Sequence, residues 1–77
     1  MTLSALDLNL LPLLGALLET NSVQEAAARV HLSPSAASHG LGRLRELYGD
    51  ELLVRAGRRL EPTPRAQELA PQVQHIL

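Results

Sequence analysis

The sequence contains no cysteine and no lysine, and Tyr48 is its only aromatic residue. Without cysteine it has no disulfide framework, no zinc–thiolate site and no thiol nucleophile. It has no run of about 18 apolar residues that would span a membrane, and segment 1–11 lacks the basic start of a signal peptide. The lack of cysteine leaves the compartment unconstrained by redox, a reducing cytoplasm fits, and we expect a cytoplasmic location.

The residues that are present favour a small helical domain. The chain has 77 residues, enough for one domain. Apolar residues make up 45% of it, mostly Leu and Ala, which are strong helix formers, while strand-forming aromatic and β-branched residues are scarce. The net charge of −1 taken alone argues against a nucleic-acid partner.

The charge is unevenly distributed along the chain. Segment 1–28 carries three acidic residues and no basic one, whereas segment 29–65 holds all seven arginines against four acidic residues. Arginine suits bidentate contacts with phosphate or guanine. The basic middle segment is therefore where we expect any acidic partner to bind.

Apolar spacing predicts a first helix with an unusually wide apolar stripe. We expect Asp7 to be its N-cap after a loose segment 1–6, and its end to lie near residues 19–21. The stripe is formed by Leu10, Leu11, Leu13, Leu14, Leu17 and Leu18. Its width fits burial within this chain and equally fits contact of one part with a second chain.

Capping signals predict the next two helices. Ser22 and Glu25 have the spacing of a capping box ahead of a helix over 23–30. Ser33 followed by Pro34 predicts the start of a third helix that runs to about residue 48. Two helices joined across 31–33 are the helix-turn-helix arrangement, in which the second helix enters a major groove of DNA.

The third predicted helix has a polar face suited to such a contact. Ser35, Ser38 and His39 are short hydrogen-bonding side chains on one face, with Arg43 at its flank. Gly42 adds no bulk there, so the helix could approach a duplex closely. A solvated polar helix face is the alternative interpretation.

Segment 52–62 is predicted to form a β-hairpin around Gly57, and a last helix is predicted to begin at Thr63-Pro64. Arg55, Arg58 and Arg59 gather near the hairpin tip. A solvated turn does not need three arginines, whereas a wing touching DNA backbone or minor groove would use them.

The sequence shows no catalytic or metal-binding pattern. Its histidines, at positions 31, 39 and 75, fall on different predicted elements, and no HExxH or glycine-rich phosphate loop occurs. We expect no enzyme activity, no metal and no cofactor in this domain. The competing interpretation is a small helical protein-interaction module, for which the arginines at the hairpin tip have no evident use.

Together these motifs resemble the N-terminal winged helix-turn-helix of LysR-type transcriptional regulators, over about residues 6–77. The matching segments are LDLNLL at 6–11, SVQEAA at 22–27, LSPSAASH at 32–39, LGRL at 41–44, LLVR at 52–55 and GRRLEPT at 57–63.

The resemblance implies a mostly α fold, with three helices and a short hairpin wing over 1–62 and the start of a linker helix over 63–77. It implies binding of promoter DNA as a dimer or tetramer on an interrupted dyad. It also places the effector-binding domain, and any small-molecule effector, outside this chain. The expected dimer contacts are Leu10, Leu14, Leu69, Val73 and Ile76.

Contact positions of the family carry over residue by residue. Ser33, Ser38 and Arg55 match the family pattern, whereas Pro34-Ser35 stand where Gln-Pro is usual and His39 stands where Arg or Lys is common. A neutral His is a weaker, pH-dependent phosphate ligand. The expected DNA-binding residues are Ser22, Ser33, Pro34, Ser35, Ser38, His39, Arg43, Arg55, Arg58 and Arg59.

Overall fold

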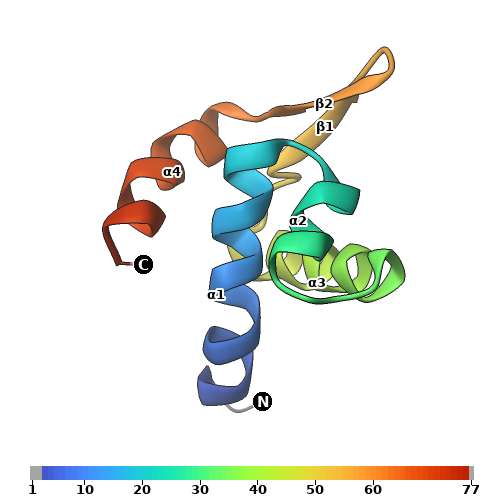
Figure 1. Ribbon diagram of the computed structural model, residues 1–77. Coiled ribbons are helices and arrows are strands. Elements are labelled where there is room, and N and C mark those ends of the chain that lie inside the picture. Colours follow the sequence, from blue (N-terminus) through green and yellow to red (C-terminus); the bar gives the residue numbers. More distant parts are fainter. Residues whose placement is uncertain (1–2, 77) are drawn as a thin grey trace.

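The computed structural model describes the backbone of residues 3–76 and the side chains of residues 10–75. Its elements, in chain order, are α1 (Leu3–Thr20), α2 (Val23–Arg29), α3 (Pro34–Tyr48), β1 (Leu53–Ala56), β2 (Arg59–Pro62) and α4 (Pro64–Ile76). Helix α1 runs through the middle of the molecule, with α2 and α3 on one side and α4 on the other, while the hairpin projects outward (Figure 1). The expected mostly α, winged helix-turn-helix fold is confirmed.

Helix α1 begins earlier than its sequence predicts. It starts at Leu3, so Asp7 lies inside the helix and is not its N-cap. Leu3, Ala5 and Leu6 are good helix formers, so segment 1–6 is not a loose lead throughout. Pro12 removes one backbone hydrogen bond without ending the helix.

The predicted caps form at all three later helices. Ser22 Oγ accepts a hydrogen bond from Glu25 N (3.2 Å), Ser33 Oγ from Ala36 N (3.1 Å) and Thr63 Oγ1 from Ala66 N (3.1 Å). Each bond satisfies a backbone donor that a helix start leaves free. Only one of the two hydrogen bonds of the capping box forms, because the N–H of Ser22 donates to Thr20 Oγ1 (3.2 Å) rather than to the side chain of Glu25.

The core lies where α1 meets the other helices and the hairpin base. Gly40 lies in the α1–α3 contact, where a Cβ would collide with Leu13 Cδ2 and crowd Leu10. Glycine at this position thus lets the two helices approach closely. The buried apolar side chains are Leu10, Leu13, Leu14, Ala16, Leu17, Ala26, Ala27, Ala37, Leu41, Leu44, Leu52, Leu53, Ala66 and Val73.

The hairpin is antiparallel, with Leu53 paired to Pro62 and Ala56 paired to Arg59. Gly57 begins the two-residue turn at a φ of 67°, which glycine adopts without strain. Leu52 and Leu53 anchor the base with fully buried side chains. None of the helices within residues 3–76 combines the length and hydropathy that a membrane crossing requires.

Candidate nucleic-acid interface

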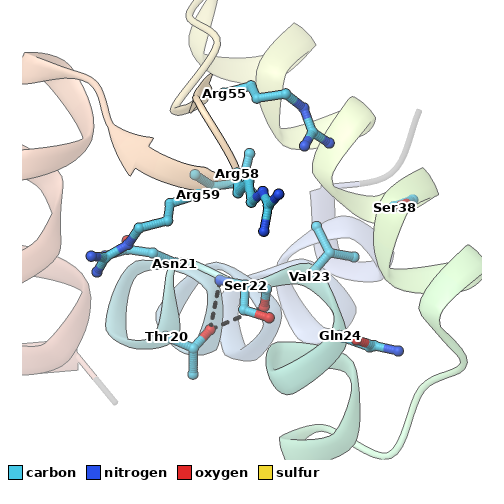
Figure 2. A pocket seen from close by; sticks show the side chains of 10 residues that line it. Thr20, Asn21, Ser22, Val23, Gln24, Ser38, Arg55, Arg58 and Arg59 are labelled. Carbon is cyan, nitrogen blue, oxygen red and sulfur yellow. Dashed lines mark hydrogen bonds between the residues drawn. The ribbon is translucent and has the colours of Figure 1, made fainter.

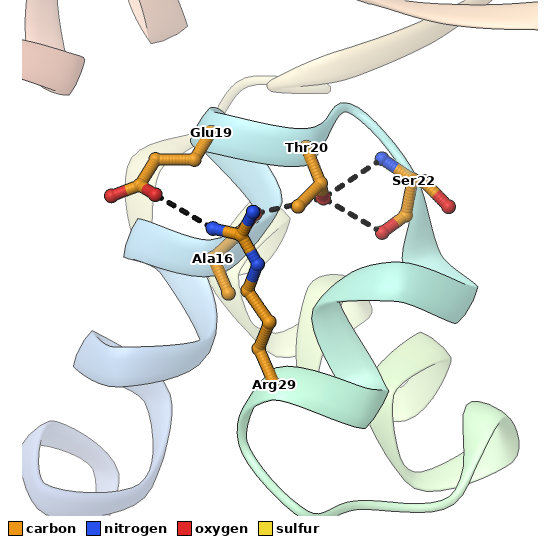
Figure 3. A network of polar contacts seen from close by, with 5 residues as sticks. All are labelled: Ala16, Glu19, Thr20, Ser22 and Arg29. Carbon is orange, nitrogen blue, oxygen red and sulfur yellow. Dashed lines mark hydrogen bonds and ion pairs between the residues drawn. The ribbon is translucent and has the colours of Figure 1, made fainter.

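Helices α2 and α3 form the expected helix-turn-helix. The turn between them contains His31 at a φ of 59°, and Leu32 N–H donates to Ala27 O (2.9 Å). On the other side of α2, Arg29 Nη1 pairs with Glu19 Oε2 of α1 (2.7 Å), and Thr20 Oγ1 donates to Ala16 O (2.8 Å) (Figure 3). The Arg29–Glu19 pair is an exposed contact between α2 and α1, and Thr20 Oγ1 also accepts a hydrogen bond from Ser22 N at the start of α2 (3.2 Å).

The N-terminal half of α3 presents its polar residues outward. Ser33 Oγ lies 3.4 Å from Ser35 Oγ and also caps the helix. Gly42 has open space around the position of a Cβ. The residues expected to touch DNA at the N-cap and on α3 are all exposed: Ser33, Pro34, Ser35, Ser38, His39 and Arg43.

A hollow of about 580 Å³ lies between the start of α2, α3 and the hairpin. Figure 2 shows the arginine side chains extending from the hairpin, with Arg58 pointing toward Ser22 and Ser38 at the α3 side. Five expected residues line the hollow together: Ser22, Ser38, Arg55, Arg58 and Arg59. The remaining five, at the N-cap position 33 and at positions 34, 35, 39 and 43 of α3, do not line the hollow.

The hollow also includes residues that the sequence pattern did not single out: Thr20, Asn21 and Gln24. Asn21 Oδ1 is buried there and has no hydrogen-bond partner among the described residues. The residue has a φ of 52°, a backbone conformation in which Asn is enriched. The Asn between the first two predicted helices was therefore the sequence signal that could have indicated the turn beside this hollow.

The electrostatics of the hollow are one-sided. Arg55, Arg58 and Arg59 are exposed, and none of the ten described lining residues is acidic. In the described part of the chain the ion pairs join Arg29 to Glu19 and Arg45 to Glu51, so neither engages a wing arginine. The wing guanidinium groups thus retain donors for an external anion.

Three of the five residues expected at a dimer contact are buried within this chain. Leu14 and Val73 are only 1% and 3% exposed and Leu10 is also buried, so all three side chains belong to the core of this chain. Helix α4 packs against α1 and covers part of the α1 stripe, whereas Leu11 and Leu18 are only partly buried. Contact of the remaining part with a second chain stays a prediction. Leu69 is half-buried against the same core, and the side chain of Ile76 lies outside the described residues.

These features define the class: a winged helix-turn-helix domain with an exposed recognition helix and a basic wing. The sequence profile of the bacterial regulatory helix-turn-helix proteins of the lysR family matches residues 8–67. The chain belongs to this family.

The chain is similar to regulators of known name. It is 51% identical to the HTH-type transcriptional regulator LinR of Sphingobium indicum and 48% identical to nodulation protein D 1 of Rhizobium meliloti, each over 77 residues. These alignments cover the whole chain but only 25% of each relative, so the chain spans about a quarter of their length.

Solved structures show the same architecture. The probable transcriptional regulator PA0477 from Pseudomonas aeruginosa superimposes with a TM-score of 0.86 at 47% identity, over 96% of this chain and 25% of that one. The BenM DBD in complex with catB site 1 DNA superimposes with a TM-score of 0.77 at 24% identity, over 86% and 74% of the two chains. The family is one of transcriptional regulators rather than enzymes, and its match favours DNA binding over the interaction-module alternative.

Proposed function

We propose that this domain binds double-stranded promoter DNA with α3 in the major groove and the hairpin on the flanking backbone or minor groove. The hollow carries the proposal, because three exposed arginines line it beside the polar, exposed start of α3. A phosphate backbone crossing from one groove to the next would meet these guanidinium groups. Base contacts would come from Ser35, Ser38, His39 and Arg43, with Ser33 and Pro34 at the helix start.

We also propose that two copies bind an interrupted dyad, with residues 1–62 as the DNA reader and 63–77 as the start of the pairing helix. Because Leu10, Leu14 and Val73 are used in the core, pairing would involve the outer side of α4 around Leu69. Sedimentation over a range of concentrations tests this, and a monomer at every concentration would count against it. We further propose a cytoplasmic location, no cofactor in this domain, and an effector bound elsewhere in a longer protein that forms dimers or tetramers.

The central experiment selects bound duplexes from a random pool and then measures affinity across a salt series. We expect two related half-sites, and an affinity whose logarithm falls linearly with the logarithm of salt concentration by about 0.9 per neutralised phosphate. Arg55→Ala should weaken binding to all sequences about equally, as expected for a phosphate contact. Arg29→Ala is the control, since Arg29 pairs with Glu19 away from the hollow. Affinity that does not vary with salt, or no binding to any duplex, would overturn the proposal.

A further inference from the structure

The connection from α3 to the hairpin contains a strained turn. Leu52 has a φ of 66° although it is a bulky residue with a fully buried side chain. Leu53 N–H donates to Glu51 O (2.7 Å), which closes a three-residue turn around Leu52. Such a conformation persists only where the surroundings determine it, and this one lies where the wing begins.

Arg45 of α3 holds both carbonyl groups that flank Leu52. Its Nε donates to Glu51 O (2.7 Å) and its Nη2 donates to Leu53 O (2.7 Å). Its Nε also lies 3.6 Å from Glu51 Oε2. The planar guanidinium can bridge two acceptors at once, which the single ammonium group of lysine does less well. A side chain of the recognition helix is thus bonded directly to the start of the wing.

Other contacts secure the turn on its remaining sides. Leu52 N–H donates to Asp50 Oδ2 (2.8 Å), and Thr63 N–H donates to Leu52 O (2.9 Å). These bonds tie the two ends of the hairpin to each other and to the start of α4. The bonds from Arg45 are the ones that tie the hairpin base to α3.

We propose that Arg45 is a positioning residue for DNA recognition, which fixes the direction of the wing relative to α3 so that both reach the same duplex. The inference rests on the proposed function. Arg45 acts at the hairpin base through backbone carbonyls, whereas the arginines of the hollow lie toward the tip. Its role is therefore to place Arg55, Arg58 and Arg59 rather than to bind the phosphates that they bind.

A first experiment tests the positioning without DNA. Because the chain has no cysteine, spin labels can be attached after Ala36→Cys on α3 and Ala56→Cys on the wing, both at exposed positions. We expect Arg45→Met to widen the distance distribution between the labels, and Arg29→Met, which removes the same charge elsewhere, to leave it unchanged. Superimposable distributions for Arg45→Met and the parent chain would overturn the proposal.

A second experiment asks whether Arg45 acts through the wing. We expect Arg45→Met to reduce the salt slope of DNA binding by about 1 for each wing arginine that is displaced. The loss caused by Arg55→Ala should then be smaller in the Arg45→Met background than in the parent chain. Additive losses with an unchanged slope would show a merely structural role.

Arg45→Lys retains the charge and also serves if Arg45→Met fails to fold. We expect it to behave like Arg45→Met, because one ammonium group does not reproduce the two-point bridge. Full recovery of the parent slope and distance distribution would overturn the proposal. A parent chain that binds no DNA would overturn the proposed function instead, and the spin-label result would still decide whether Arg45 orients the wing.

Discussion

The base and the tip of the hairpin wing differ in burial and in how their polar groups are used. At the base, Leu52 and Leu53 are fully buried, and nearby backbone groups bond to Arg45, Asp50 and Thr63. At the tip, Arg58 is exposed, and no ion pair within the described residues involves it. The polar groups of the base are used inside the domain, whereas those of the tip remain free for a partner.

Replacing a buried residue at the base should have the largest effect on stability. We expect Leu53→Ala to lower the free energy of unfolding by about 2–5 kcal/mol, because it leaves a cavity in the core. The neighbouring Val54 is 38% exposed, so Val54→Ala should change stability by only about 0.5 kcal/mol. Urea denaturation of both variants measures the contrast, and equal losses would contradict the distinction between inner and outer faces of β1.

Low pH should destabilise the base of the hairpin through protonation of Asp50. The carboxylate accepts a hydrogen bond from Thr63 Oγ1 (2.6 Å) and one from Leu52 N (2.8 Å). The Thr63 bond is the main cause that lowers the pKa of Asp50 below its ordinary value of 3.8, followed by the Leu52 bond, while burial opposes the shift. The resulting stability is fully present above pH 3.8 and is lost as the pH falls through the lower pKa of the folded state.

Asp50→Asn tests this linkage because it removes the titrating group. We expect the variant to be less stable at neutral pH and to lose less stability on acidification than the parent chain, as measured by urea unfolding between neutral pH and about pH 2. Glu61→Gln, which removes a carboxylate from the exposed side of β2, should retain the parental acid dependence. The same acid dependence in Asp50→Asn would contradict a role for Asp50 at the base.

Local signals in the sequence predicted most of the elements. Ser22, Ser33 and Thr63 mark the starts of α2, α3 and α4, and Gly57 marks the hairpin turn. These features act over a few residues, so neighbouring letters suffice to detect them. The start of α1 was missed because Asp7 is a residue type typical of an N-cap, whereas Leu3, Ala5 and Leu6 continue the helix upstream.

Features that depend on tertiary contacts could not be predicted. Gly40 and Gly42 are equivalent in helix propensity, yet Gly40 packs against Leu13 while Gly42 has open space. In the sequence, Arg45 is one more basic residue of the recognition helix. Only the folded chain brings its guanidinium to Glu51 O and Leu53 O. The charge pattern located the basic segment of the chain. That Thr20 and Asn21 line the same hollow as the arginines could be seen only in the folded chain.

The smallest effect on stability is expected at the tip, where function should suffer instead. Arg58→Ala should change the free energy of unfolding by no more than about 0.5 kcal/mol, because it removes no described ion pair. It should nevertheless reduce the salt slope of DNA binding by about 1, since one phosphate contact and its released counterion are lost. Urea denaturation and affinity across a salt series measure the two quantities on the same protein.

Arg58→Lys separates charge from shape at this position. A lysine retains the positive charge, so the salt slope should return to the parental value even if the geometry of the contact changes. Loss of stability in Arg58→Ala as large as that in Leu53→Ala would mean that the tip also holds the fold together. An unchanged slope in Arg58→Ala would mean that Arg58 faces solvent rather than phosphate, and the DNA path would then follow Arg55 on the α3 side of the hollow.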